Sequence, residues 1–399
     1  MISFELTDEH KMVQDMVRKF AERELAPHIK EWDVLHGGYP RSVLDHMGEQ
    51  GILGICFPEK YGGGGMDYIS LAVACEELER IDTSFRVPLS VHIGLCGLGL
   101  LQWGTEEQKQ KYLVPLATGE KLGTFGLTEP NAGSDPAALE MQARNVGDHY
   151  VLNGEKMWIS LADIADTFLV IARTGTRADR ARGISAFIIE RGMPGFKSDT
   201  IHGKMGIRAG NTGSFSLVDT PVPAENLVGE EGEGFKIAMS CLDGGRYTVA
   251  AGSVGLIRGC LEASVKYAHE RETFGRPIAE HQLVQQMIAR MARGYDISRL
   301  LVWRAGWLKN QGIRNTRETG LAKWAACDEA FQAATDAVEI HGAYGFSNEY
   351  PVERHLRNCK GAVIYEGSAE IQTLLAAGYA LGHRQDKPLR RELPSWPFE

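Results

Sequence analysis

The hydrophobic period of this sequence changes twice, and these two changes constrain the fold more than any other feature. From Thr7 to about residue 117, apolar residues recur with the spacing of amphipathic helices. Between about 122 and 218 they form short β-branched and aromatic runs, without the strand–helix alternation of a parallel sheet. From 234 the helical period returns over long stretches with few prolines. The order is therefore α, β, α, and a Rossmann domain is not expected.

The same changes divide the 399 residues into four segments. We expect an N-terminal helical domain over 1–121, a middle antiparallel β-barrel or sandwich domain over 122–232, a C-terminal four-helix bundle over 233–385 and an irregular tail over 386–399. The expected helices cover 41–53, 68–80, 87–103, 106–117, 234–271, 280–311, 317–342 and 367–380, besides a first helix for which Thr7 is the expected N-cap. The fold class is mixed α and β, and mostly helical.

Composition excludes several classes of protein. The formal net charge of −9 argues against a general nucleic-acid binder or a protein that binds anionic membranes. The seven cysteines are scattered and never spaced C-x-x-C, so we expect neither disulfides nor a metal site. No apolar run approaches the length of a membrane span, and the first residues resemble neither a secretory signal nor a transit peptide. We expect a cytoplasmic protein, or one of the mitochondrial matrix if this is a processed mature form.

Four short segments carry candidate chemistry. They are FGLTEPNAGSD at 125–135, WIS at 158–160, RETFGRPIAEHQ at 271–282 and VIYEGSAEIQ at 363–372. The first offers hydroxyls and backbone N–H groups to a ring edge or a phosphate, although many such loops are plain turns. Arg271 could bind a pyrophosphate, or simply complement a helix C-terminus. Glu366, between apolar residues and a glycine, is either a candidate base or a partner of a helix N-terminus.

In this order the four segments resemble the acyl-CoA dehydrogenase family of flavoproteins over residues 1–385, with glutaryl-CoA dehydrogenase as the nearest subfamily. The resemblance implies an enzyme in which Glu366 removes the α-proton of an acyl-CoA thioester while hydride leaves the β-carbon for FAD. It implies these cofactor-binding residues: Phe125, Leu127, Thr128, Ser134, Trp158, Ser160, Arg271, Phe274, Gln282, Gly342, Ser368 and Glu370. Ser160 stands where the family more often has threonine, and Ala343 stands where it has a glycine near FAD.

The resemblance also implies a set of substrate-binding residues. They are Arg86, Ser90, Glu79, Ser134, Asp243, Arg246, Tyr365 and Gly367. Arg86 stands where glutaryl-CoA dehydrogenases bind the distal carboxylate, although a solvated arginine at a helix start is the alternative. We therefore expect a dicarboxylic acyl-CoA such as glutaryl-CoA, with or without decarboxylation, or a substituted succinyl-CoA such as benzylsuccinyl-CoA. Val87-Pro88 departs from that subfamily and could reshape the acyl pocket.

Two other functions stay open at this point. One is the dehydrogenation of a short, branched or cyclic monocarboxylic acyl-CoA, with Arg86 in a structural role. The other is a non-catalytic flavin-binding scaffold. The resemblance further implies non-covalent FAD, electron-transfer flavoprotein as the electron acceptor, and a homotetramer in which Arg271 and Phe274 reach the FAD of a neighbouring subunit. It implies no nucleic-acid partner and no membrane insertion.

Overall fold

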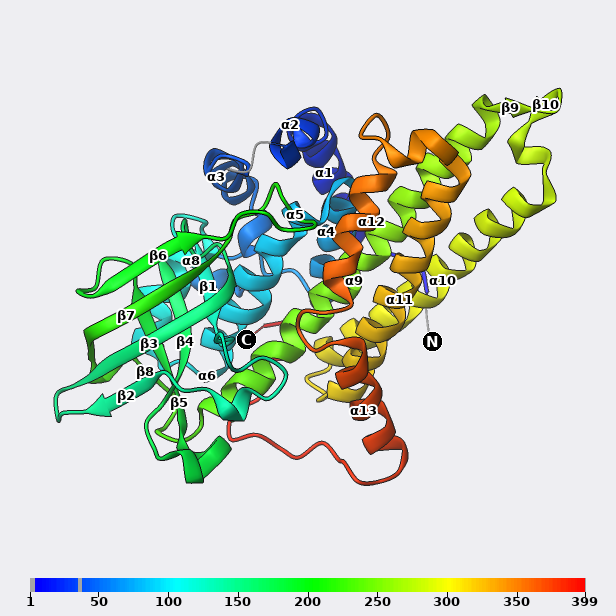
Figure 1. Ribbon diagram of the computed structural model, residues 1–399. Helices are drawn as coiled ribbons and strands as arrows, with labels where there is room; N and C mark the ends of the chain where they lie inside the picture. Colours follow the sequence, from blue (N-terminus) through cyan, green and yellow to red (C-terminus); the bar gives the residue numbers. More distant parts are fainter. Residues whose placement is uncertain (1–3, 35–37, 399) are drawn as a thin grey trace.

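The structure is a computed structural model, and it describes residues 4–34 and 38–398. The β-sheet forms one end of the molecule and the long C-terminal helices extend away from it, with the N-terminal helices packed against both (Figure 1). The predicted order α, β, α is confirmed. Residues 1–3, on which part of the expectation about a leader peptide rests, lie outside the described residues.

The N-terminal part is helical throughout. Its helices are α1 (Asp8–Phe20), α2 (Ile29–Val34), α3 (Ser42–Glu49), α4 (Tyr68–Ile81), α5 (Thr83–Pro88), α6 (Leu98–Trp103), α7 (Glu106–Gln108) and α8 (Val114–Ala117), with π-helical stretches η1 (Ala21–Leu25), η4 (Leu89–Gly97) and η5 (Lys109–Leu113). The predicted cap of α1 is confirmed, because the Thr7 hydroxyl accepts a hydrogen bond from the His10 N–H and the His10 side chain bonds the Thr7 N–H in return.

One continuous helical segment, formed by α5, η4 and α6, runs through the centre of the protein. Pro88 lies inside it and lacks an N–H, and the π-helical stretch η4 begins at the next residue. We expected no run long enough to cross a membrane, whereas Thr83–Trp103 is long and apolar enough by length and composition. All of its most apolar window is buried inside the protein, as in the core helix of a globular domain.

The middle part is a single twisted sheet. Its strands are β1 (Gly123–Gly126), β2 (Gln142–Asn145), β3 (His149–Ser160), β4 (Thr167–Arg173), β5 (Ile184–Glu190), β6 (Phe196–Thr200), β7 (Thr212–Pro223) and β8 (Leu227–Val228). They follow the order β6-β7-β3-β2-β4-β5-β8, and β1 pairs with β4 off this path. The expectation of a wholly antiparallel sheet is wrong for β1–β4 and for one pair of β2–β4, which are parallel. Because long connections separate these strands in the chain, the parallel direction is open to them.

The C-terminal part contains three long helices and two shorter ones. They are α9 (Gly234–Glu270), α10 (Gln282–Asn310), α11 (Thr316–His341), α12 (Val352–Ala362) and α13 (Ala369–Ala380), and the short hairpin β9 (Glu272–Thr273) and β10 (Arg276–Pro277) joins α9 to α10. The four predicted helices agree with α9, α10, α11 and α13 to within two residues at each end, and α12 was not predicted. Alanines of α11 at helical spacing let it pack closely on its neighbours; they are Ala326, Ala330, Ala333 and Ala337.

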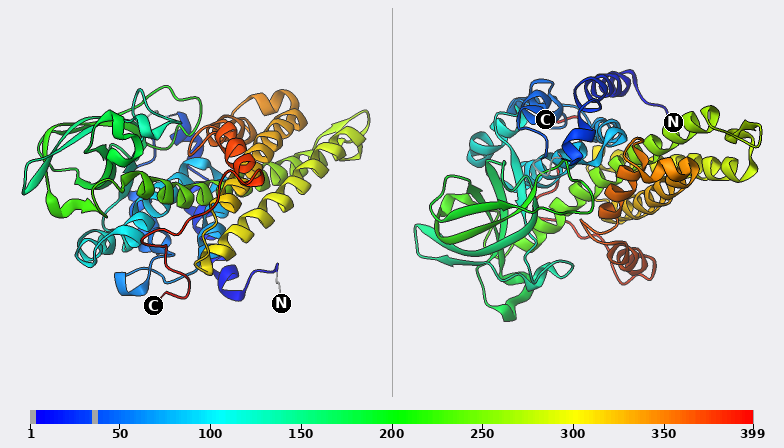
Figure 2. Two further views of the ribbon diagram at one scale, coloured as in Figure 1. Left: turned by 90° about the horizontal axis from the view of Figure 1, so that it is seen from below. Right: turned by 45° about the horizontal axis from the view of Figure 1, so that its top comes forward.

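The chain after α13 runs back across the molecule without helix or strand as far as residue 398 (Figure 2). The Arg391 guanidinium donates to the carbonyls of Trp103 and Gly104 at 2.7 Å each. The Trp396 indole N–H donates to the carbonyl of Gly65 at 3.0 Å. The tail is therefore fastened to the N-terminal helices. The element type changes between α8 and β1 and again between β8 and α9, while the predicted domain boundaries themselves stay a prediction.

A buried carboxylate joins α1, α4 and α9. Glu77 of α4 is fully buried and accepts hydrogen bonds from Arg18 of α1 and Arg258 of α9 at 2.9 and 2.7 Å. Burial alone would raise the pKa of Glu77, but the hydrogen bonds and positive charges of these two arginines outweigh it and leave the pKa lowered. The ionised carboxylate is thus part of what attaches the first helix to the core.

We expect Glu77→Gln to destabilise the protein by about 3 kcal/mol, because it removes the fully buried anion between Arg18, which is 35% exposed, and Arg258, which keeps Glu262 as a partner. Since the folded pKa of Glu77 is lowered, its contribution is complete above the unfolded pKa of about 4.3 and is lost as the pH falls through the folded value. Thermal unfolding measured from about pH 6 down to about pH 3 should show a steeper loss for the wild type than for the variant.

The matched control is Glu262→Gln, which removes the half-exposed partner of the same Arg258. It should cost no more than about 1 kcal/mol. Equal losses in the two variants would contradict a special role of the buried carboxylate.

Candidate active site

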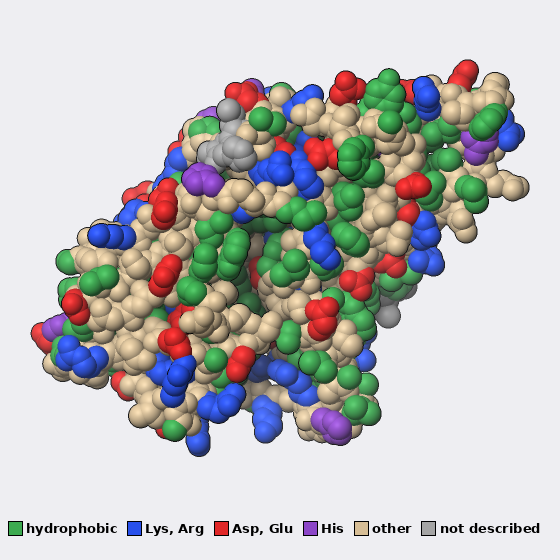
Figure 3. Space-filling model, viewed as in Figure 1, with side chains coloured by type: hydrophobic (Ala, Val, Ile, Leu, Met, Phe, Trp, Pro, Cys, Tyr) green, Lys and Arg blue, Asp and Glu red, His purple; other side chains and the backbone are tan. Residues whose placement is uncertain are grey.

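Glu366 lies in the turn between α12 and α13. On the face of the molecule drawn in Figure 3, a hollow opens between the sheet and the C-terminal helices. The Oε2 atom of Glu366 is buried and has no hydrogen-bond partner among the described residues. The carboxylate rests on α9 at Gly245, where a Cβ would lie 2.0 Å from Oε2. Only a glycine leaves room for the carboxylate at this position of the helix.

The electrostatic surroundings of Glu366 favour its neutral form. Burial raises the pKa of Glu366, the positive charges of Arg86, Lys323 and Arg246 act in the opposite direction, and the resulting pKa is about 7. A carboxylate with this pKa accepts a proton near neutral pH. The group is therefore suited to general acid–base chemistry.

The backbone of the turn is held in a sparsely populated conformation. Glu366 has φ of 53° and Gly367 has φ of 91°. The Glu366 carbonyl accepts a hydrogen bond from Arg246 Nε at 3.1 Å, and the Gly367 carbonyl accepts one from Lys323 Nζ at 2.8 Å. Gln372 Nε2 adds a bond to the Gly367 carbonyl at 3.3 Å. Arg246 and Gly367 were predicted from the sequence to act here, whereas Lys323 and Gln372 were not.

Four of the predicted substrate residues form one cluster around Arg86. The side chain of Arg86 is 1% exposed, so the alternative of a solvated arginine is wrong. Its Nε donates to Glu79 at 2.5 Å, one terminal nitrogen to Ser90 at 2.9 Å and the other to the Tyr365 hydroxyl at 2.7 Å. These bonds use three of the five N–H groups of the guanidinium.

Helix α9 connects the Arg86 cluster to Glu366. At Gly252 a Cβ would lie 1.9 Å from Glu79 Oε2 and 2.7 Å from Arg86 Nε, so this cluster also rests on bare backbone. Gly245 and Gly252 are seven residues apart, which places them on one face of the helix and roughly 10 Å from each other along its axis. Thr248 lies between them, and its hydroxyl is 2.7 Å from that of Ser90.

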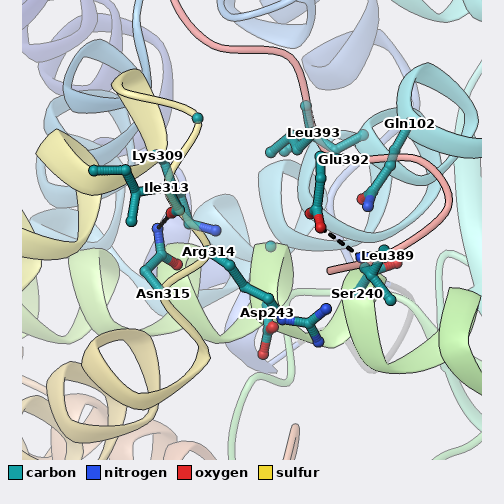
Figure 4. Close-up of a pocket in the computed structure, with 13 residues that line it drawn as sticks. Gln102, Ser240, Asp243, Lys309, Ile313, Arg314, Asn315, Leu389, Glu392 and Leu393 are labelled. Atoms are coloured by element: carbon teal, nitrogen blue, oxygen red, sulfur yellow. Dashed lines mark hydrogen bonds between the residues drawn. The ribbon is translucent and has the colours of Figure 1, made fainter. Parts of the chain in front are cut away.

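Asp243 lies on α9, two residues before Gly245. It accepts a hydrogen bond from the Thr316 hydroxyl at 2.6 Å and is 3.4 Å from an Arg246 nitrogen. Its side chain lines a polar cavity, together with Lys309 and Arg314 from the end of α10 and the turn that follows. Figure 4 shows Asp243 on one side of this cavity and tail residues on the other. Glu366 is not among the residues that line this cavity.

A second group of predicted residues gathers where β1 and β3 end. Leu127 and Thr128 follow β1, and the Thr128 carbonyl accepts a hydrogen bond from the Met157 N–H of β3 at 2.9 Å. Trp158 has φ of 62° and an exposed fraction of 58%. Within the described part of the chain, the hydroxyls of Thr128 and Ser160 form no hydrogen bond. A half-exposed indole beside two free hydroxyls fits the flat, hydrogen-bonding ring of a flavin.

The remaining predicted residues of this region differ in how far they are buried. Phe125 is buried in β1, whereas Ser134 is exposed in the following turn. A buried ion pair that sequence reasoning missed supports the loop, because Lys156 Nζ donates to Glu129 at 2.6 Å and to the Leu127 carbonyl at 3.0 Å.

The other predicted cofactor residues lie elsewhere. Arg271, Phe274 and Gln282 sit at the tip of the α9–α10 hairpin, at the opposite end of the molecule from the sheet (Figure 1), and Phe274 is 97% exposed. One chain therefore does not bring them to the ends of β1 and β3. Exposed Gly342 begins the 3₁₀ turn η10 (Gly342–Phe346), and Ser368 caps α13 beside exposed Glu370. The described residues contain no group of three His, Cys, Asp or Glu placed to hold a metal ion.

Comparisons with known proteins cover almost the whole chain. Residues 7–120, 124–220 and 232–380 match the models "Acyl-CoA dehydrogenase, N-terminal domain", "middle domain" and "C-terminal domain". A relative from Clostridium acetobutylicum, "Acyl-CoA dehydrogenase, short-chain specific", is 44% identical over 94% of this chain and 99% of its own. "Glutaryl-CoA dehydrogenase" from Desulfococcus multivorans is 40% identical over 96% of this chain and 99% of its own. The prediction that glutaryl-CoA dehydrogenase is the nearest subfamily is therefore not confirmed.

A solved structure gives the same architecture. It is described as "Electron transferring flavoprotein of Acidaminococcus fermentans: Towards a mechanism of flavin-based electron bifurcation". A chain in it is 46% identical to this one, with a TM-score of 0.93 and coverage of 95% of this chain and 100% of that chain.

We expect the Glu366 carboxyl to titrate near pH 7, because burial raises its pKa more than the three neighbouring cations lower it. Infrared difference spectra between about pH 5 and about pH 9 should contain a protonated-carboxyl band that disappears in Glu366→Gln. The matched control is Glu370→Gln, since Glu370 is exposed in the same region and its pKa is lowered by hydrogen bonds from Ser368 and its own backbone N–H. A Glu366 band that titrates with ordinary carboxyls would contradict the assignment.

Proposed function

This chain belongs to the acyl-CoA dehydrogenase family and catalyses FAD-dependent dehydrogenation of an acyl-CoA thioester, and we propose that Glu366 is the base of that reaction. The observation that carries this proposal is the buried Glu366 Oε2, which has no hydrogen-bond partner in the described residues and belongs to a carboxyl with a pKa of about 7. An unpartnered, desolvated carboxylate is basic enough to take a proton from a carbon acid that is itself activated.

Activation of the thioester requires a donor at its carbonyl oxygen. The N–H of Glu366 forms no hydrogen bond with any described residue, and Arg246 and Lys323 hold the two carbonyls that follow it in the turn. We infer that this N–H donates to the thioester carbonyl and stabilises the enolate that forms when the α-proton moves to the Glu366 carboxylate. FAD, when bound, would supply the acceptor for the hydride that leaves the β-carbon.

The residues for the flavin ring are those at the ends of β1 and β3. Thr128 and Ser160 offer free hydroxyls, and Trp158 offers a half-exposed flat side chain next to them. Arg271 and Phe274 are too far from this place to serve the same FAD in one chain (Figure 1). We propose that they serve the FAD of a second copy, in a homotetramer, and that the electrons leave to an electron-transfer flavoprotein.

We propose a short acyl group that ends at Arg86. The roughly 10 Å between Gly245 and Gly252 along α9 is a distance that a short acyl chain of a few carbon atoms would bridge between the base and the guanidinium. Two N–H groups of Arg86 remain beyond the three that bond Glu79, Ser90 and Tyr365. A distal carboxylate on the substrate would use both, which supports a dicarboxylic acyl-CoA such as glutaryl-CoA or a substituted succinyl-CoA.

The second candidate substrate is a short, branched or cyclic monocarboxylic acyl-CoA, and the comparisons favour it. The short-chain relative is more similar to this chain than the glutaryl-CoA relative. In addition, Glu79 already neutralises Arg86 at 2.5 Å, so the pair can close the acyl pocket without a second anion. Both candidates share a short acyl chain, and they differ in the group that faces Arg86.

Glu366→Gln should slow flavin reduction by at least about 10²–10⁴-fold, because the amide keeps the shape of the carboxylate but cannot accept the proton. In the wild type the rate should rise with pH through about 7, since only the ionised carboxylate is a base. Stopped-flow bleaching of bound FAD by glutaryl-CoA and butyryl-CoA measures both. Bleaching of the variant at the wild-type rate would show that Glu366 is not the base.

Arg86→Gln separates the two substrate classes. If the guanidinium binds a distal carboxylate, kcat/KM for glutaryl-CoA should fall at least about tenfold while that for butyryl-CoA stays the same or rises. A panel with benzylsuccinyl-CoA and isobutyryl-CoA, read with product masses, identifies the acyl group and any decarboxylation.

The double variant Glu79→Gln/Arg86→Gln is the control, because it removes both charges and leaves no buried carboxylate unpaired. It should show the same difference in kcat/KM between glutaryl-CoA and butyryl-CoA as Arg86→Gln, and it should be more stable than Arg86→Gln. Equal losses on both thioesters would assign Arg86 a structural role and favour the monocarboxylic substrate.

A further inference from the structure

Lys323 of α11 is a buried cation beside the turn that carries Glu366. It is fully buried, and its Nζ donates to the Gly367 carbonyl at 2.8 Å. Burial lowers the pKa of Lys323, while the nearby Cys327 and Glu366 act to raise it. Burying an ammonium group costs free energy, so packing alone does not explain why Lys323 is buried here.

The turn itself requires support from outside. A residue other than glycine at φ of 53°, as Glu366 is, is strained and persists only where its surroundings hold it. Arg246 from α9 holds the carbonyl of Glu366, and Lys323 from α11 holds the next carbonyl along the chain. Together they fix two successive peptide planes on the C-terminal side of the carboxylate.

Three cations act on the Glu366 carboxylate, and they differ in how far they are neutralised. Arg86 of α5 pairs with Glu79 of α4 at 2.5 Å. Arg246 has Asp243 of α9 at 3.4 Å. In the part of the chain that the structure describes, no carboxylate forms an ion pair with Lys323. The other titratable groups beside this site are Tyr365, next in the chain, and Cys327 and Asp328 of α11, of which Asp328 acts on Lys323 through its charge without an ion pair.

We propose that Lys323 is a positioning residue for the base. It holds the Gly367 carbonyl so that the strained turn keeps the Glu366 carboxylate against α9, and it supplies the unpaired positive charge that favours the ionised base. The proposal rests on the proposed function of Glu366. It differs from a purely structural role because it couples Lys323 to the proton affinity of another residue.

The test compares Lys323→Met with Lys323→Arg in the FAD-loaded protein. The wild type is first assayed with glutaryl-CoA and butyryl-CoA, and the faster thioester is the probe. We expect Lys323→Met to slow flavin reduction by up to about 100-fold, the scale of a displaced catalytic group, with little change in the thioester concentration that gives half-saturation. The midpoint of the pH–rate profile should move upward, because removal of a cation makes the carboxylate more basic.

Lys323→Arg keeps the donor and the charge and should restore most of the rate and the midpoint. Arg293→Met is the matched control, because it removes a more exposed cation that faces Glu329 of the same helix α11 at 3.7 Å. It should leave both quantities unchanged. If Lys323→Met does not yield loaded protein, Lys323→Gln replaces it, since the amide still donates but carries no charge.

The proposal is overturned if the pH midpoint of Lys323→Met or Lys323→Gln equals that of the wild type, whatever the loss of rate or stability. It is also overturned if arginine fails to restore the midpoint. A failure of the proposed function looks different, because it requires Glu366→Gln to reduce its flavin at the wild-type rate.

Discussion

The contact of charged side chains with the bare backbone of α9 is the constraint on which the rest of the site depends. The 37 residues of this helix run from the sheet through the core. A Cβ at Gly245 would lie 2.0 Å from Glu366 Oε2, one at Gly252 would lie 1.9 Å from Glu79 Oε2, and one at Gly255 would lie 2.0 Å from the carbonyl of Glu76. Helix α4 and the turn before α13 therefore approach α9 only because these positions lack side chains.

Close approach to a buried helix brings charged groups into a medium of low dielectric, where an unpaired charge is unfavourable. Most buried charges are paired at short distance, as are Glu77 with Arg258, Glu79 with Arg86 and Glu129 with Lys156. Lys323 is one exception, because no carboxylate of the described residues pairs with it, and Glu366 is another, because its buried Oε2 has no hydrogen-bond partner there. The same packing that stabilises the paired groups thus keeps this carboxylate close to neutrality and ready to accept a proton.

The fold was predictable from the sequence where structure depends on near neighbours. The hydrophobic period located α9, α10 and α11, because a long helix repeats its apolar face many times. Strand β8, with two residues, is too short to establish a period in the sequence. The parallel pairing of β1 with β4 was missed, because register between distant strands is set by how the chain returns.

The sequence by itself determined the α, β, α order, the cap at Thr7 and, through family resemblance, the candidates Glu366 and Arg86. It also contained one signal that was overlooked: Lys323 occupies a position on the apolar stripe of α11, where a cation needs a partner. Only the tertiary structure decided that Arg86 bonds Tyr365, 279 residues away, and that Lys323 bonds Gly367. The physical reason is the distance along the chain over which each interaction acts. Backbone hydrogen bonds and side-chain period act over a few residues and can be read along the chain, whereas burial and pKa depend on groups that only the packed fold brings together.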